Sequence, residues 1–244
     1  MKVFALIPAR YLASRFPGKL MQLLGDKPVI LHTYENAVAT GLFDEVWVIT
    51  DSELIYQTIK AVGGNVLMSV QQHESGSDRI AEAVEQMDVD VVVNVQGDEP
   101  FVQKAPLEKL VRVFADKEVR VASLMRPISS QEDWEKSNHV KVVTKNNGDA
   151  LYFSRAPIPY HAAEHNSLHA FLHVGVYAYR RATLLQFTTW PQAVLEKVEK
   201  LEQLRYLSQG VAIRMVEVAE ENIAIDIPAD LERAAAYLAQ KNSA

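Results

Sequence analysis

A basic segment near the start of the chain carries the residue types and spacing that most directly suggest chemistry. Residues 7–19 contain three cations and no acidic residue, and the cations are Arg10, Arg15 and Lys19. A Pro-Gly pair just before the lysine predicts a tight turn. Cations on a turning loop suit a polyanion such as a nucleoside triphosphate. A solvated basic loop is the alternative, and charge alone does not decide between the two.

Two aspartates are candidate metal ligands. Asp98 follows residues 89–95, the most apolar strand that the sequence predicts, and Asp226 follows an apolar pair. One or two carboxylates together with substrate phosphates is the usual arrangement around Mg²⁺, so we predict a magnesium site beside the basic loop. The alternatives are a cap of the helix beginning near Gln103 for Asp98, and an ordinary helix-start acid for Asp226 or Asp230.

Other polar positions permit both a binding and a structural interpretation. Residues 75–79 open a predicted helix whose free N–H groups favour an anion or a base carbonyl, although Ser77 could equally be the helix N-cap. His173 and Tyr177 share one face of a predicted strand, with Gly175 leaving room for a polyol ligand between them. A lone histidine or tyrosine on a strand is more often structural. The segment 199–205 looks like a solvated helix face.

The elements that must position these residues alternate between strand and helix up to about residue 117. Predicted strands lie at 3–7, 45–50, 65–68 and 89–95, and predicted helices at 28–40, 53–61, 80–87 and 107–115. This alternation predicts an α/β fold with a mostly parallel, doubly wound sheet.

The pattern then changes to one with few helices. Strands are predicted at 120–125, 139–145, 150–154 and within 168–179, followed by a helix at 194–206, a strand at 212–218 and a helix at 229–240. The Asn-Asn-Gly sequence at 146–148 predicts a hairpin. We therefore expect one domain over 1–244 with a smaller antiparallel part at roughly 120–190, which could carry a dimer contact.

Composition limits the class of protein. The chain has 244 residues, no cysteine and a formal net charge of −6. Disulfides, thiolate catalysis and cysteine zinc sites are excluded, and the acidic balance argues against general nucleic-acid binding. No signal peptide, lipidation signal or membrane span is recognisable, so a cytoplasmic protein without membrane partners is expected.

Several segments, in this order along the chain, resemble one family of enzymes. The sequence is similar to the 3-deoxy-manno-octulosonate (Kdo) cytidylyltransferases, or CMP-Kdo synthetases, in IPARYLASRFPGK, SGSDRIAE, VNVQGDEP, VKVV with ALYFSRAPIPY, HVGVYAYRR, EKLEQLR and AIDIPADLE. The resemblance covers residues 7–232. It implies a nucleotidyltransferase-like α/β fold, a homodimer, and a Mg²⁺-dependent reaction of CTP with Kdo that gives CMP-Kdo and pyrophosphate for lipopolysaccharide biosynthesis.

The resemblance also implies roles for single residues. The triphosphate would be held by Arg10, Arg15 and Lys19, with Ser77 supplying a hydroxyl where the family usually has threonine. Asp98 and Asp226 match the metal-binding acids, which together with Lys19 form the catalytic group, while Gln96 and Arg79 match contacts to nucleotide or sugar. The positions that enclose Kdo are Arg155, His173, Tyr177, Glu202 and Gln203, which replaces the interpretation of the last two as a solvated face.

Three departures from the family pattern leave the expected chemistry intact. Leu20-Met21 follows the Pro-Gly-Lys sequence where proline and leucine are usual, the segment between Tyr160 and His173 is short, and the second aspartate motif lacks the usual glycine and threonine. The open alternatives are the same chemistry on 8-amino-Kdo or sialic acid, a uridylyl- or guanylyltransferase of similar fold, and a catalytically silent nucleotide-binding protein.

Overall fold

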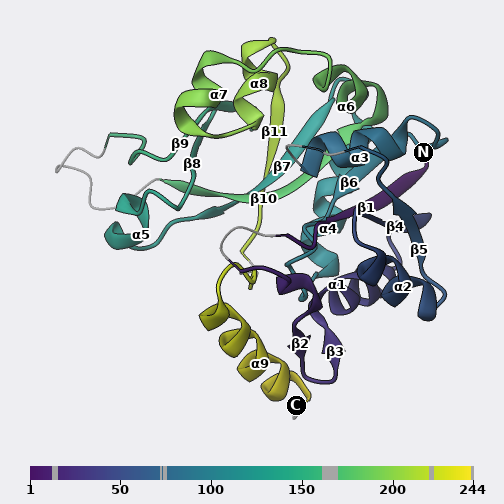
Figure 1. The fold of residues 1–244 in the computed structure, drawn as a ribbon. Coiled ribbons are helices and arrows are strands. Elements are labelled where there is room, and N and C mark those ends of the chain that lie inside the picture. Colours follow the sequence, from purple (N-terminus) through teal and green to yellow (C-terminus); the bar gives the residue numbers. More distant parts are fainter. Residues whose placement is uncertain (13–15, 72, 74–75, 161–169, 220–222, 243–244) are drawn as a thin grey trace. The chain divides into compact units, whose positions relative to one another are not determined.

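The structure is a computed structural model of residues 1–244, and it describes all of them except 13–15, 72, 74–75, 161–169, 220–222 and 243–244 (Figure 1). The chain forms two compact units. The first unit consists of residues 1–105 and 221–244, and the second unit of residues 106–220. One domain with a strand-rich part at 120–190 stays a prediction.

Parallel strands form the centre of the first unit. They are β1 (Val3–Ala9), β4 (Glu45–Thr50), β5 (Asn65–Met68) and β6 (Val91–Asn94), in the order β6-β1-β4-β5. Each neighbouring pair is parallel. The chain runs outward from β1 through β4 to β5 and then returns to the other side of β1 as β6. Ligands of parallel α/β sheets bind where the strand order reverses in this way, at the carboxyl ends of the strands.

Helices connect these strands, as the sequence predicts. The connecting helices are α1 (Val29–Ala39), α2 (Glu53–Ala61) and α3 (Gly76–Val84). Helix α9 (Pro228–Asn242) also belongs to this unit, and α4 (Lys104–Arg112) starts where the unit ends. Ser52 caps α2 by accepting a hydrogen bond from the Ile55 N–H. The short hairpin of β2 (Leu23–Leu24) and β3 (Lys27–Pro28) was not expected from the sequence.

The second unit is mostly antiparallel, which confirms the change of pattern after residue 117. Its strands are β7 (Val121–Pro127), β8 (Lys141–Thr144), β9 (Ala150–Ser154), β10 (Phe171–Arg180) and β11 (Ile213–Glu217). Strand β10 pairs antiparallel with β7 and β8, and β8 forms the predicted hairpin with β9. Only β11 among these described strands is parallel to its neighbour, β7.

The helix predicted over 194–206 is wrong, because the chain forms two helices there. The helices of the second unit are α5 (Gln131–Glu135), α6 (Arg181–Phe187), α7 (Val194–Glu199) and α8 (Gln203–Ser208). Lys200 interrupts the helix with a left-handed φ of 54°. The break lets the buried Glu196 and Arg205 pair, with Nε 2.9 Å from Oε2. On one straight helix, residues nine apart would lie on opposite sides.

Helices of the described residues are too short or too polar for a bilayer. No helix among them combines the length and the apolar character that crossing a membrane requires.

Candidate active site

The basic loop after β1 folds back on itself and presents Lys19. The Gly18 N–H donates to the Tyr11 carbonyl at 3.0 Å, and Gly18 adopts a left-handed φ of 69° that favours glycine. Lys19 then begins a 3₁₀ turn, and its side chain is largely buried. Arg10 is exposed, whereas Arg15 lies outside the described residues.

The ammonium of Lys19 joins the two predicted metal-binding acids. Lys19 Nζ donates to the carboxylate of Asp98 and, at 3.0 Å, to Asp226 Oδ1. Burial alone would lower the pKa of Lys19, but attraction and hydrogen bonds from the two aspartates outweigh it and raise the pKa. Lys19 therefore keeps its charge at neutral pH. The fold thus brings residues 207 positions apart in sequence to one point of the first unit.

The loop carrying Asp98 is fixed by α1. Gly97 lies so close to β1 that an added Cβ would be 3.1 Å from the Pro8 carbonyl oxygen. The Thr33 hydroxyl donates to the Gly97 carbonyl at 2.9 Å, and the Asn36 amide donates to the Pro100 carbonyl at 2.6 Å. Since α4 begins at Lys104 and the Asp98 carboxylate binds Lys19, the alternative that Asp98 caps this helix is wrong.

The second aspartate segment is held against this loop. The Ile225 N–H donates to the Asp98 carbonyl at 2.9 Å, which places Asp226 beside Asp98. Asp230 is the helix-start acid, because its Oδ2 accepts the N–H groups of Asp226 at 2.9 Å and Ile227 at 3.0 Å. Burial would raise the pKa of Asp230, but these bonds and Arg233 lower it. Asp230 positions Asp226, whose carboxylate faces Lys19.

The paired carboxylates of Asp98 and Asp226 suit a magnesium ion. Both lie within reach of one cation, as their shared contact with Lys19 shows. No cluster of three or more histidine, cysteine or acidic side chains able to hold a metal occurs among the described residues. Mg²⁺ fits such a small donor set, because it is usually bound by one or two carboxylates plus waters and substrate phosphates.

The remaining candidates of the first unit surround the start of α3. Helix α3 begins at Gly76, so Ser77 lies in its first turn rather than at the N-cap. Arg79 is buried, and its Nη2 donates to Asp51 Oδ2 at 2.7 Å. Arg79 Nη1 is buried with no hydrogen-bond partner among the described residues. Gln96 follows β6 and is half-buried. Leaving the buried Nη1 of Arg79 without a hydrogen-bond partner is costly, which favours an acceptor for it on a bound ligand.

Asp51 was not singled out as a site residue. Asp51 follows β4 and holds the guanidinium of Arg79. Its place directly after a buried parallel strand is the same sequence signal that identified Asp98.

In the second unit, His173 and Tyr177 lie together on β10. Their rings are 5.2 Å apart between centroids. The regular alternation that predicted this is interrupted, since the pairing with β7 shifts between Val174 and Tyr177. Gly175 lies within this bulge, and an added Cβ there would meet nothing within 4 Å. The space at Gly175 is therefore open, but the two rings contact each other, so the expected room for a ligand between them is absent.

Hydrogen bonding fixes the state of the His173 ring. Ser123 Oγ lies 2.9 Å from His173 Nε2 and donates to the Val176 carbonyl at 2.8 Å. Because a hydroxyl has one proton to donate, Nε2 carries the histidine proton and Nδ1 is an acceptor. Burial lowers the pKa of His173 to about 3. It also raises the pKa of Tyr177, with smaller effects from Tyr179 and Glu202, so this phenol stays protonated.

We predict that His173 stays neutral throughout the physiological range. With a folded pKa of about 3 against an ordinary 6.5, the unfolded chain binds the extra proton between these pH values, so His173 makes stability fall as the pH drops through that window. Nitrogen NMR of His173 should show a protonated Nε2 and no titration from pH 5.5 to 8. A His173→Asn spectrum assigns the signal. An inflection near pH 6.5 would contradict the assignment.

The turn between α7 and α8 contains or contacts three of the expected sugar-binding residues, which are Arg155, Glu202 and Gln203. Arg155 Nε donates to the Glu199 carbonyl at 2.8 Å, and Nη1 donates to the Ser137 carbonyl at 3.3 Å. Glu202 is the residue before α8 and Gln203 is its first residue. Gln203 is buried, so the interpretation as a solvated face is wrong for it.

The chain is similar to known cytidylyltransferases along most of its length. A family model described as Cytidylyltransferase matches residues 4–217. The 3-deoxy-manno-octulosonate cytidylyltransferase of Flavobacterium johnsoniae is 54% identical over 241 residues, covering 98% of this chain and 99% of the relative. The enzyme of that name from Geobacter metallireducens is 44% identical, covering 96% of each chain.

Solved structures show the same fold. A structure of CMP:2-keto-3-deoxy-manno-octonic acid synthetase complexed with CTP superposes with a TM-score of 0.94 at 41% identity, covering 99% of this chain and 100% of that one. A 4-diphosphocytidyl-2C-methyl-D-erythritol synthase from Anaerococcus prevotii superposes with a TM-score of 0.67 at 14% identity. At that identity the likeness shows the fold alone.

Proposed function

Because the chain belongs to the 3-deoxy-manno-octulosonate cytidylyltransferase family, we propose that it joins CTP and Kdo to give CMP-Kdo and pyrophosphate. The chain is a nucleotidyltransferase with a mostly parallel α/β fold. The structural observation that supports the proposal best is the contact of Lys19 with both Asp98 and Asp226. It places a cation and two carboxylates at the strand ends where an α/β sheet binds its ligand.

The first unit binds CTP in this proposal. Arg10, Arg15 and Lys19 hold the triphosphate, and the raised pKa of Lys19 keeps its charge available to the β- and γ-phosphates. Ser77 offers its hydroxyl at the start of α3, where the helix dipole also favours an anion. Gln96 and the buried Nη1 of Arg79 are donors for the nucleotide or the sugar.

Asp98 and Asp226 would hold Mg²⁺. The ion would supply charge neutralisation at the reacting phosphate and the departing pyrophosphate. Asp230 keeps Asp226 in place through its two backbone hydrogen bonds.

The second unit binds the sugar acid. The guanidinium of Arg155 suits the carboxylate of Kdo. His173 Nδ1 accepts a hydrogen bond from one sugar hydroxyl and the Tyr177 phenol donates a hydrogen bond to another, so the pair recognises two hydroxyl groups of the sugar. Glu202 and Gln203 add one carboxylate and one amide from the turn before α8.

The reaction is an in-line displacement. The anomeric hydroxyl oxygen of Kdo attacks the α-phosphorus of CTP, a new P–O bond forms, and the bond to the bridging oxygen of pyrophosphate breaks. The hydroxyl proton leaves to Asp98 or to solvent. Lys19 neutralises charge on the departing pyrophosphate. Catalysis is mainly positioning and charge neutralisation, so no strong general base is required.

Pyrophosphate release with paired substrates tests the function. The wild-type protein with Mg²⁺ should release pyrophosphate from CTP and Kdo, and much less with UTP or GTP, or with N-acetylneuraminate or 8-amino-Kdo in place of Kdo. Release with another sugar acid would show that this acid, rather than Kdo, is the substrate of the same nucleotidyl transfer. Binding of CTP without release for any pair would contradict the proposal and favour a silent nucleotide-binding protein.

The family resemblance also supports a homodimer acting in the cytoplasm, which we include in the proposal. Sedimentation equilibrium of the purified chain should give twice the monomer mass. A monomer with full activity would contradict the dimer.

A further inference from the structure

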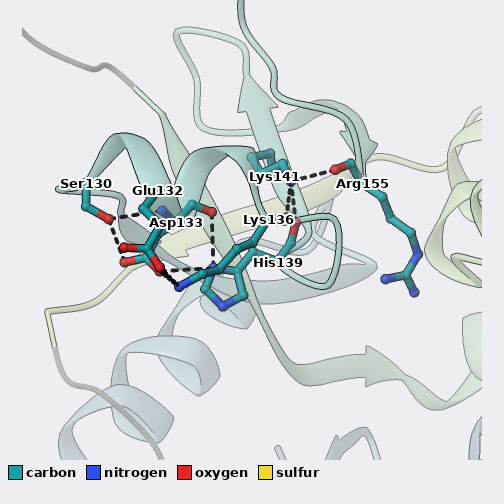
Figure 2. Close-up of polar contacts among 7 residues, drawn as sticks. All are labelled: Ser130, Glu132, Asp133, Lys136, His139, Lys141 and Arg155. Carbon is teal, nitrogen blue, oxygen red and sulfur yellow. Dashed lines mark hydrogen bonds and ion pairs between the residues drawn. The ribbon is translucent and has the colours of Figure 1, made fainter.

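The peptide groups on both sides of Arg155 are bound by two oppositely charged side chains. Lys141 Nζ donates to the Arg155 carbonyl at 2.6 Å, a contact drawn in Figure 2. The Arg155 N–H donates to Glu199 Oε2 at 2.9 Å. The backbone of one proposed sugar-binding residue is thus held by an ammonium on its C-terminal side and a carboxylate on its N-terminal side.

The buried ammonium of Lys141 donates hydrogen bonds to backbone carbonyls at three places in the chain. It is the first residue of β8, and its side chain is fully buried. Besides Arg155, its Nζ donates to the carbonyls of Lys136 at 2.8 Å and His139 at 2.5 Å. An ammonium has three protons, so these carbonyls use its full donor capacity. Lys141 therefore ties the end of α5 and the approach to β8 to the residue that follows β9.

Glu199 binds the same residue twice from the end of α7. Its carboxylate accepts the Arg155 N–H, and its backbone carbonyl accepts Arg155 Nε at 2.8 Å. The other carboxylate oxygen accepts from the hydroxyl of Ser154 at 2.6 Å. Burial would raise the pKa of Glu199, but the hydrogen bonds from Arg155, Ser154 and Tyr152 lower it, so the carboxylate stays ionised.

These contacts determine where the guanidinium lies. In Figure 2 the Arg155 side chain extends away from Lys141, on the opposite side from the bound carbonyl. Its Nε donates to the Glu199 carbonyl, its Nη1 to the Ser137 carbonyl at 3.3 Å and its Nη2 to the Lys200 carbonyl at 3.5 Å, so these contacts use three of its five N–H donors. Glu199 also ends the helix that leads to the turn with Glu202 and Gln203.

We propose that Lys141 and Glu199 are positioning residues for the sugar acid, which fix the backbone of Arg155 and thereby aim its guanidinium at the substrate carboxylate. This inference rests on the proposed function, in which Arg155 binds Kdo. Neither residue needs to touch the substrate. Their loss should weaken the use of Kdo and leave the binding of CTP, which belongs to the first unit, unchanged.

The test separates KM for Kdo from KM for CTP. Lys141→Met keeps the length of the side chain but leaves the Arg155 carbonyl without its ammonium. We expect KM for Kdo to rise by about 10-fold or more, because a small misplacement of a binding group is costly, while KM for CTP stays within about twofold. Glu199→Gln is the second variant if Lys141→Met fails to fold, since an amide has one acceptor oxygen and cannot accept both the Arg155 N–H and the Ser154 hydroxyl.

Lys136→Met is the matched control. Lys136 belongs to the same cluster in Figure 2, but its half-exposed side chain pairs with Glu132 at 2.9 Å and Asp133 at 3.1 Å rather than with Arg155. Its backbone carbonyl, which Lys141 binds, is retained. KM for both substrates should stay at the wild-type values.

The outcomes distinguish this inference from the proposed function. A selective rise of KM for Kdo in the folded variants supports the positioning role. Wild-type turnover with unchanged KM for Kdo in Lys141→Met and Glu199→Gln would overturn the positioning role and leave the function standing. An equal rise of both KM values, or loss of kcat alone, would also overturn it and indicate a general structural role. A wild-type protein without Kdo-dependent release would overturn the function and this inference with it.

Discussion

Replacing Asp98 with asparagine should lower kcat by on the order of 10²- to 10³-fold, as expected when one group that stabilises transition-state charge is lost. The amide has the shape of the carboxylate but carries no charge for Mg²⁺ or for Lys19. The Asp98 loop should keep its fold, because its backbone is held by Thr33 and Asn36 rather than by the carboxylate. Steady-state kinetics with saturating CTP and Kdo measure the change.

Asp149→Asn is the matched control for this variant. Asp149 accepts from Arg214 Nε at 2.7 Å in the second unit, and its side chain is 13% exposed against 22% for Asp98. Loss of this aspartate–cation pair should leave kcat unchanged. Near-normal turnover of folded Asp98→Asn would remove Asp98 from the catalytic group.

Replacing Lys19 with methionine should raise KM for CTP and lower kcat together. A hydrogen bond to a charged group contributes about 1.5–3 kcal/mol, which corresponds to a loss of about 10- to 150-fold in kcat/KM for CTP. The variant also leaves the carboxylates of Asp98 and Asp226 without the ammonium between them, so they repel each other. Initial rates over a range of CTP concentrations at saturating Kdo measure the loss.

Lys27→Met controls for the removal of a lysine from the first unit. Lys27 pairs with Glu35 at 2.8 Å at the surface, where ion pairs contribute little. CTP kinetics should be those of the wild-type protein. The triphosphate role of Lys19 is wrong if both lysine variants use CTP equally well.

The regular elements could be predicted where local sequence determines them. The bounds of β4, α2 and β5 are those that the sequence predicts, since short buried apolar runs mark the strands and Ser52 marks the helix start. Gly63, with a left-handed φ of 73°, ends α2 as expected.

Long-range contacts decided the parts that could not be predicted. The leucine- and glutamate-rich stretch at 194–206 has a continuous helical pattern, and only the buried pairing of Glu196 with Arg205 and the contacts of Arg155 with Glu199 explain its break at Lys200. The bulge in β10 likewise depends on Ser123 of β7, which lies about 50 residues away in sequence.

The chemistry of the site was easier to predict than its geometry. Residue types and a strand end were enough to make Lys19, Asp98 and Asp226 candidates, and the family resemblance then put them together as a catalytic group. The direct contact of Lys19 with both carboxylates depends on the packing of the segment that contains Ile225 against the Asp98 loop, which no local pattern contains. Lys141 and Glu199 were not selected, because a single buried lysine within a strand carries no pattern of its own.

The most direct test of the proposed reaction follows the anomeric oxygen of Kdo. Wild-type protein is incubated with CTP, Mg²⁺ and Kdo freshly labelled with ¹⁸O at the anomeric hydroxyl, and the products are read by phosphorus NMR. Mass spectrometry of the remaining Kdo corrects for exchange with water. The proposed mechanism predicts the label in the bridge between phosphorus and sugar of CMP-Kdo, and unlabelled pyrophosphate. No CMP-Kdo, or CMP-Kdo whose bridge lacks the label while the remaining Kdo keeps it, would contradict the central claim.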